Sequence, residues 1–201
     1  MMQSSAKADL LDVSRIATGK VELKLERVEL GALVQQSVDA VGGMLQALNH
    51  SLDLDTTGEP LWLNADPVRI VQILTNLLTN AAKYTDPGGK LSLAVKREGD
   101  GAVVRVTDNG VGFSPEMKDR LFTLFAQAED AIGRSAGGLG IGLALVREFV
   151  ERHGGTVDAA SAGPMRGSQF TVRLPLAGAP SQAILQGMRA SSSNEYTEHR
   201  R

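Results

Sequence analysis

The most constraining feature of the sequence is a helix whose start, end and apolar face are all marked. Asp66 and Pro67 are typical of a helix start, an N-cap residue followed by proline at the first helical position. Asp86-Pro87-Gly88-Gly89 ends the pattern, so we expect a helix over 67–83. At about 100° per residue, its apolar side chains share one broad arc: Ile70, Ile73, Leu74, Leu77, Leu78, Ala81 and Ala82. Such an arc is buried by packing against another layer.

The rest of the chain alternates between helical and strand patterns. Further helices are predicted over 4–17, 29–50, a short stretch near 115–122, and 139–153. Strands are predicted over 21–28, 51–55, 61–65, 90–98, 102–108, 156–161 and 168–176. We expect a hairpin between 90–98 and 102–108, and a pair of short strands at 51–55 and 61–65. Helices interspersed with antiparallel hairpins indicate the α+β class, with helices packed on one face of a sheet.

Composition excludes several classes of function. Twenty-one basic and 23 acidic residues leave a net charge of −2, so no nucleic-acid partner is expected. No apolar run reaches the roughly 18–20 residues that span a bilayer, and the start lacks a secretory apolar region, so we expect a cytoplasmic segment without membrane contact. The absence of cysteine excludes disulfides and thiolate metal sites. His50, His153 and His199 are too scattered to suggest a metal site.

The polar side of the helix over 67–83 carries the first candidate site. Asn76, Asn80 and Lys83 share one narrow arc with Arg69 and Gln72. A solvated face is the common explanation, but asparagine is a poorer helix former than alanine by roughly 0.5–0.7 kcal/mol. An amide oxygen is a hard ligand suited to Mg²⁺, and the lysine beside it can reach phosphate oxygens. The arc is either a solvated face or a site for Mg²⁺ and phosphate.

A second candidate follows the strand over 102–108. Alternation puts Asp108 on the same face as Val104 and Val106, so a covered face would bury its carboxylate. A buried carboxylate needs hydrogen-bond donors, and the exocyclic amine of a purine is one. Gly110 and Gly112 would let the chain turn closely against a flat ligand. An ordinary Asp-Asn-Gly turn is the alternative.

The third candidate is the glycine-rich run before the helix over 139–153. It consists of Gly137, Gly138, Leu139, Gly140, Ile141, Gly142 and Leu143. Backbone N–H groups at a helix N-terminus form a natural phosphate cradle, although a flexible hinge would need the same glycines. The small and polar residues over 126–136 suit a mobile lid, with Arg134 as its phosphate contact.

In this order, the three elements resemble the ATP-binding catalytic domain of sensor histidine kinases. The superfamily of that domain includes DNA gyrase, the ATP-dependent heat-shock chaperones and MutL. The matching motifs are an N box (76–85), a first glycine box (108–112), an F box (121–125), a second glycine box (137–143) and a closing strand (167–171 with Leu174-Pro175). The resemblance covers about residues 9–176.

The resemblance implies a Bergerat-type ATP-binding fold, a two-layer sandwich whose mixed, mostly antiparallel sheet carries helices on one face. It implies Mg²⁺ as a cofactor at Asn80 and adenine recognition by Asp108. The residues expected to contact ATP are Asn76, Asn80, Lys83, Tyr84, Asp108, Gly110, Gly112, Arg134, Gly138, Leu139, Gly140, Ile141, Gly142, Leu143 and Thr171. Leu139 stands where the family often has threonine, and Thr123-Leu124 depart from the acidic residue and proline of its F box.

By the same resemblance, residues 1–19 are the end of a dimerisation and phosphoacceptor helix with its linker. Residues 20–176 form the ATP-binding catalytic domain, and 177–201 a flexible tail. The implied enzyme is an ATP-dependent protein-histidine kinase of a two-component system. Its partners would be the dimerisation domain and, indirectly, the receiver domain of a response regulator. None of the three histidines has the sequence context of the phosphoacceptor, so we expect this chain alone not to phosphorylate itself.

Two other functions remain open. A conformational switch driven by ATP hydrolysis would resemble gyrase or MutL, but those relatives carry a glutamate base where this chain has Asn76. A non-catalytic nucleotide-binding or docking module would be indicated by a degraded ATP site, yet the motif residues are present. A histidine followed by an acidic residue on a preceding helix would discriminate in favour of the kinase.

Overall fold

The structure is a computed structural model that describes residues 22–56, 58–124 and 140–177. The predicted helix over 4–17, the predicted lid over 126–136 and the predicted tail beyond residue 177 lie outside these residues. The described elements are β1 (Glu26–Glu29), α2 (Leu30–Ala47), β2 (Ser51–Thr56), β3 (Trp62–Ala65), α3 (Pro67–Lys83), β4 (Lys90–Glu98), β5 (Gly101–Asp108), α4 (Pro115–Lys118), α5 (Gly142–Arg152), β6 (Thr156–Ala160) and β7 (Ser168–Pro175).

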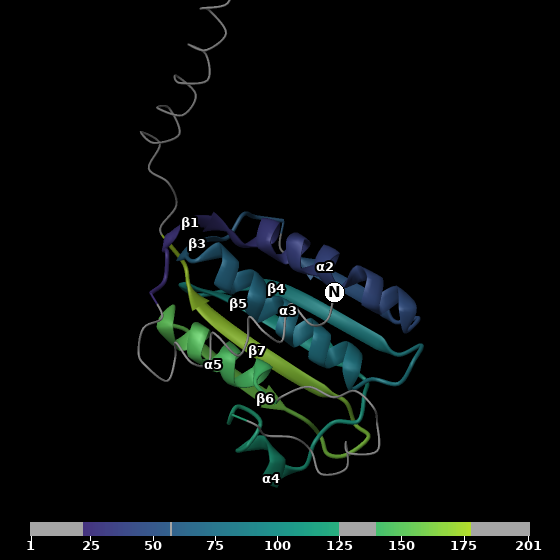
Figure 1. The fold of residues 1–201 in the computed structure, drawn as a ribbon. Helices are drawn as coiled ribbons and strands as arrows, with labels where there is room; N and C mark the ends of the chain where they lie inside the picture. Colours follow the sequence, from purple (N-terminus) through teal and green to yellow (C-terminus); the bar gives the residue numbers. More distant parts are fainter. Residues whose placement is uncertain (1–21, 57, 125–139, 178–201) are drawn as a thin grey trace, which may run out of the picture.

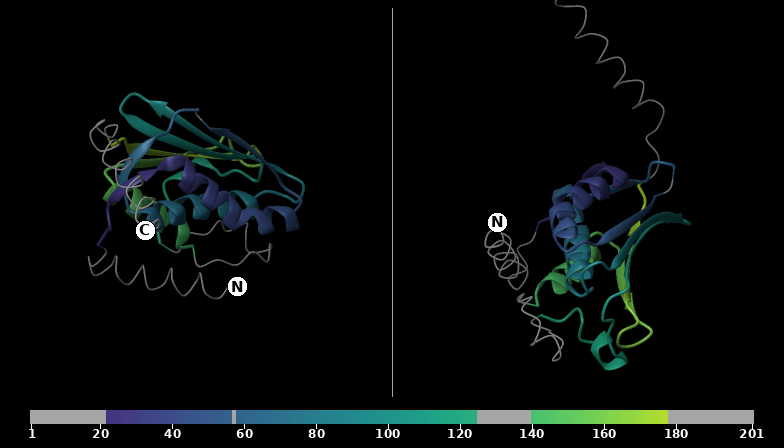
Figure 2. Two further views of the ribbon diagram at one scale, coloured as in Figure 1. Left: turned by 90° about the horizontal axis from the view of Figure 1, so that it is seen from above. Right: turned by 90° about the vertical axis from the view of Figure 1, so that its right-hand side faces the viewer.

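The fold has two layers, and the predicted α+β class is confirmed. A five-stranded sheet has the order β2-β4-β5-β7-β6, in which only the β2–β4 pair is parallel. Helices α2, α3 and α5 cover one face of this sheet and leave the other uncovered (Figures 1 and 2). A separate ribbon pairs β1 with β3. Among the described helices, none combines the length and apolar character needed to cross a bilayer.

Two strand predictions are wrong in detail. The strand expected over 21–28 is limited to β1, at Glu26–Glu29. The segments at 51–55 and 61–65 are both strands, but they do not pair with each other. Instead, β2 lies parallel to β4, with Leu52 beside Leu91 and Leu54 beside Leu93. The partner of β2 is therefore set by contact between its apolar side chains and those of β4, and not by proximity in the sequence.

Helix α3 begins and ends where the sequence predicts. The Asp66 carboxylate caps it by accepting hydrogen bonds from the N–H groups of Val68 (3.1 Å) and Arg69 (3.2 Å). All seven residues of the apolar arc are buried: Ile70, Ile73, Leu74, Leu77, Leu78, Ala81 and Ala82. Burial of these side chains against the sheet and against α2 and α5 makes α3 the central helix of its layer.

A buried histidine joins α5 to the start of α3. His153 is the C-cap of α5, and its Nδ1 lies 2.6 Å from the Phe149 carbonyl oxygen. Its Nε2 accepts a hydrogen bond from the Asp66 N–H at 3.0 Å. Because Nε2 accepts, the ring is the tautomer that donates from Nδ1. His153 therefore caps its own helix and joins it to α3. His50 is also engaged, since its Nε2 lies 2.9 Å from the Ala82 carbonyl oxygen.

Two glycines in the middle of α2 allow a direct test of helix stability. Alanine at Gly42 or Gly43 would place its Cβ in open space, because no atom lies within 4 Å. We expect each substitution to stabilise the protein by about 0.5–1 kcal/mol, since it lowers the backbone entropy lost on folding. Gly155→Ala is the contrasting variant: its Cβ would lie 2.3 Å from the Arg173 carbonyl oxygen. Urea unfolding measures all three, and destabilisation by both α2 variants would contradict this account.

Candidate functional site

The polar arc of α3 faces the start of α5. Nδ2 of Asn76 donates a 3.4 Å hydrogen bond to the Gly142 carbonyl oxygen, so the structure brings these two predicted site residues together. One turn further, the Asn80 side chain makes no hydrogen bond with another described residue. Its amide oxygen is therefore available to a hard cation such as Mg²⁺. In the described part of the chain, no three side chains of histidine, cysteine, aspartate or glutamate gather in a way that could hold a metal ion.

Lys83 and Tyr84 lie at the C-terminal end of the same helix. Partial burial lowers the pKa of the Lys83 ammonium from its ordinary value. Its Nζ lies 5.8 Å from the centroid of the Tyr84 ring, within reach of a cation–π interaction. Tyr84 is itself exposed. An ammonium held partly out of water gains more from an anionic partner than one on an open surface.

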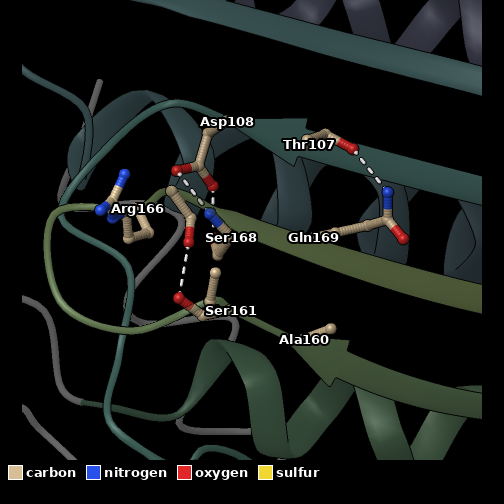
Figure 3. Close-up of a pocket in the computed structure, with 9 residues that line it drawn as sticks. Thr107, Asp108, Ala160, Ser161, Arg166, Ser168 and Gln169 are labelled. Atoms are coloured by element: carbon tan, nitrogen blue, oxygen red, sulfur yellow. Dashed lines mark hydrogen bonds between the residues drawn. The ribbon is translucent and has the colours of Figure 1, made fainter.

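Asp108 is buried at the end of β5, as its alternation with Val104 and Val106 predicts. Its Oδ1 accepts hydrogen bonds from the N–H groups of Gly110 (2.9 Å) and Ser168 (3.3 Å). The Ser168 hydroxyl donates to Oδ2 (Figure 3). A carboxylate offers about four acceptor positions. These three donors fix its orientation and leave about one position for a further donor.

Ser168 is the residue that the sequence reasoning missed. That reasoning chose Thr171 from the closing strand, but β7 pairs Thr171 with Arg105 and pairs Ser168 with Asp108. Alternation therefore puts Thr171 on the uncovered face of the sheet, away from the Asp108 carboxylate. The contact predicted for Thr171 is not supported by this placement. A serine directly after Gly167 does not by itself indicate a contact with Asp108. The register of β5 and β7 is what places Ser168 opposite that carboxylate.

The glycines after Asp108 are needed for packing within the protein. A Cβ on Gly110 would lie 2.2 Å from the Tyr84 carbonyl oxygen. Gly112 has a φ of +61°, and a Cβ there would lie 2.4 Å from the Gly163 carbonyl oxygen. The Val111 N–H also donates to the Tyr84 carbonyl at 2.9 Å. These contacts join the end of α3 to the loop that follows Asp108, a role the sequence had attributed to a flat ligand.

The start of α5 has no side-chain cap within the part of the chain that the structure describes. Its N-cap residue is Ile141, which is buried. Gly140 precedes it with a φ of +66°, a conformation that favours glycine. The N–H groups of Gly142 and Leu143 thus belong to an uncapped N-terminus, the positive end of the helix dipole. Arg134, Gly138 and Leu139 of the prediction lie outside the described residues.

An open pocket of about 250 Å³ lies at the end of the sheet (Figure 3). Its lining residues are Thr107, Asp108, Ala160, Ser161, Ala162, Arg166, Gly167, Ser168 and Gln169. Thr107 and Gln169 alternate to the uncovered face and Asp108 and Ser168 to the helical face, so the lining includes residues of both faces. The polar arc of α3, the carboxylate of Asp108 and the start of α5 form the candidate site on the helical side.

Comparisons with known proteins agree with this geometry. The family model of the histidine kinase-, DNA gyrase B- and HSP90-like ATPases matches residues 65–178. The circadian input-output histidine kinase CikA of Synechococcus elongatus is 40% identical over 169 residues, which are 83% of this chain and 22% of that protein. The alginate biosynthesis sensor protein KinB of Pseudomonas aeruginosa is 34% identical over 168 residues, 84% of this chain and 27% of that protein.

Solved structures of histidine kinases have a fold similar to that of this chain. Full-length ShkA in complex with AMPPNP has a TM-score of 0.76 at 26% identity, over 88% of this chain and 36% of that one. The mycobacterial sensor histidine kinase MprB has a TM-score of 0.68 at 25% identity, over 77% of this chain and all of that one. The chain spans only about a quarter of the length of the two curated relatives named above. Since the family model covers more than half of the chain, from the end of β3 to just beyond β7, the chain belongs to the histidine kinase-, DNA gyrase B- and HSP90-like ATPase family.

Proposed function

We propose that residues 20–176 bind Mg²⁺ and ATP and donate the γ-phosphoryl group to a histidine on a dimerisation segment, of which residues 1–19 are the end. The observation that carries this proposal is the contact between Asn76 and Gly142, which sets the polar arc of α3 beside the uncapped start of α5. Amide oxygens, an ammonium and the positive end of a helix dipole suit a triphosphate with its metal ion.

Each end of the nucleotide would have its own residues. Asp108 would accept a hydrogen bond from the exocyclic amine of adenine with its remaining acceptor position. Lys83 and the N–H groups at the start of α5 would hold phosphate oxygens. Asn80 would hold Mg²⁺ through its amide oxygen, and the ion would neutralise charge on the phosphates.

The transfer step needs little covalent chemistry from this domain. A neutral histidine nitrogen of the acceptor would attack Pγ, forming an N–P bond while the bond from Pγ to the bridging oxygen breaks and ADP leaves. Positioning and charge neutralisation then supply the catalysis. His50 and His153 support this division of roles, because both are engaged in hydrogen bonds that join elements of the fold.

The two alternatives have weaker support. Hydrolysis requires a base for water, and Asn76 is an amide that hydrogen-bonds Gly142. A non-catalytic nucleotide-binding or docking module would be indicated by a degraded ATP site, whereas Asn80, Lys83 and Asp108 are all present. We further propose that the parent kinase passes the phosphoryl group to the receiver domain of a response regulator, and that this domain lies in the cytoplasm.

Adenine recognition can be tested at Asp108 and Ser168. Asp108→Asn puts an amide donor opposite the adenine amine, and we expect ATP affinity to fall by about 1–3 kcal/mol. Ser168→Ala removes the donor to Oδ2 and is expected to cost about 1 kcal/mol and reduce the preference for ATP over GTP. Calorimetry measures both. Thr171→Val, on the other face of the sheet, is the control, and equal ATP and GTP affinity in the unaltered protein would contradict the role of Asp108.

The lowered pKa of Lys83 predicts a pH dependence of nucleotide binding. In the free protein the lysine loses its proton at lower pH than an ordinary lysine, and nearby phosphates favour the charged form. Affinity should therefore fall as pH rises through that lowered pKa, and binding there should take up protons. Calorimetry at a series of pH values from neutral up to the ordinary lysine pKa of about 10.4, in buffers of different ionisation enthalpy, measures the uptake. The Lys83→Arg variant should bind the nucleotide without proton uptake. Unchanged uptake in that variant would show that a group other than Lys83 takes up the protons.

Phosphoryl transfer is tested with γ-labelled ATP. We expect the isolated chain to bind ATP, hydrolyse it slowly and acquire no acid-labile phosphate. Supplying a phosphoacceptor helix, fused or in trans, should restore labelling, and Asn80→Ala should abolish it. Asn64→Ala removes an exposed amide from β3 and is the matched control. Strong labelling of His50, His153 or His199 in the isolated chain would show that the substrate assignment is wrong.

A further inference from the structure

The turn between β6 and β7 centres on one hydroxyl group. Ser161 directly follows β6, and its Oγ donates a hydrogen bond to the Gly167 carbonyl oxygen at 2.7 Å (Figure 3). The Gly163 carbonyl oxygen, at 3.0 Å, competes for the same proton. The Ser161 oxygen also accepts from the N–H groups of Gly163 and Phe113, each at 3.2 Å. A hydroxyl has one donor and two acceptor positions, so all three are in use. Ser161 therefore joins its own turn to a segment 48 residues earlier.

That earlier segment is the loop that follows Asp108. The backbone of the β6–β7 turn contacts this loop as well. The Gly167 N–H donates to the Gly110 carbonyl oxygen at 3.0 Å. The Met165 N–H donates to the Val111 carbonyl oxygen at 2.6 Å. The loop thus lies between this turn and the end of α3, and both sides hold it by hydrogen bonds to its backbone.

The turn has a backbone conformation that needs such support. Met165 has a φ of +60°, which is strained for a residue with a side chain. Its side chain is 67% exposed, so packing does little to hold it. Strained residues persist where the surrounding contacts over-determine them, and they cluster at ligand sites. The hydrogen bonds of Ser161 to Gly163 and Gly167, on either side of Met165, are contacts of this kind.

A short series of contacts connects Ser161 with the Asp108 carboxylate. Ser161 holds the carbonyl of Gly167, whose N–H donates to the carbonyl of Gly110. The N–H of Gly110 in turn donates to Oδ1 of Asp108 at 2.9 Å. Fixed donors are what set the orientation of a carboxylate, because hydrogen bonds weaken steeply when their angles depart from linear. Loosening the turn would therefore let the remaining acceptor position of Asp108 vary in direction.

We propose that Ser161 is a positioning residue for adenine recognition. Its hydroxyl orders the β6–β7 turn and the loop over 110–113, and so holds Asp108 in the orientation that accepts a hydrogen bond from the exocyclic amine. The inference rests on the proposed binding of ATP, and it adds a residue that acts through the protein backbone rather than on the nucleotide. Asn80 and Lys83 lie on α3, so Ser161 is expected to set the preference for the base and to leave the phosphate contacts unchanged.

The test compares ATP with inosine triphosphate, which lacks the exocyclic amine and keeps the phosphates. With Mg²⁺ present, calorimetry of the unaltered chain should show tighter binding of ATP. Ser161→Ala should reduce the ratio of the two affinities at least about five-fold, through weaker binding of ATP. Ser161→Thr keeps the hydroxyl and should restore the ratio. Ser92→Ala, at a half-buried serine of β4, is the matched control and should leave the ratio unchanged.

A second measurement follows the loop without nucleotide. In the free 201-residue chain, Ser161→Ala should speed hydrogen exchange over residues 110–113 at least about five-fold, because the Phe113 N–H loses its acceptor. Exchange in α3 should stay as it is in the unaltered chain, which checks that the fold is retained.

Three results would overturn the proposal. The first is an unchanged ratio of the two affinities in Ser161→Ala. The second is equal weakening of both nucleotides, which general destabilisation would produce. The third is a reduced ratio with unchanged exchange over 110–113, because Ser161 would then act on the base directly. Absence of ATP binding by the unaltered chain is a separate outcome, since it would contradict the proposed function and with it this role of Ser161.

Discussion

Packing of α3 against the sheet is the contact on which the other elements depend. Its seven buried apolar residues are covered by the sheet, by α2 and by α5, so each neighbouring element is placed relative to this helix. Asp66 makes most of the contacts at one end of the helix. Its carboxylate caps α3 and accepts a hydrogen bond from the Lys24 backbone N–H, while its own N–H donates to His153. Loss of this end would leave a buried ring nitrogen and several N–H groups without partners, which is costly.

The candidate site follows from the same packing. At the other end of α3, the Tyr84 carbonyl accepts from Val111 and lies against Gly110, so the loop after Asp108 is held to the helix. At its middle, Asn76 reaches the start of α5. Polar groups from three distant parts of the sequence thus share one side of the molecule because one helix touches all of them. A rigid helix with a buried arc holds such groups more accurately than a loop does.

Two sides of α3 therefore have different roles. The apolar arc stabilises the fold, and the polar arc with Asn80 and Lys83 faces the proposed nucleotide. Lys83 of the polar arc is itself half-buried, and this partial removal from water lowers its pKa.

The sequence by itself determined the features that depend on neighbours a few residues apart. The cap at Asp66, the proline after it and the apolar arc were enough to predict α3 to the residue, and alternation was enough to predict β4, β5 and the burial of Asp108. These signals are local, so no tertiary contact is needed to read them.

The tertiary structure alone decided the contacts between distant segments. Strand β2 pairs with β4 because Leu52 and Leu54 extend its apolar face, although the β3 segment is nearer in sequence. Ser168 donates to Asp108 and Thr171 does not, because the register of β5 and β7 sets which side chains share a face. A one-residue change of register would exchange those faces, and no short motif encodes it. The reason for Gly110 and Gly112 is likewise visible only in the fold, where protein backbone occupies the space a Cβ would need.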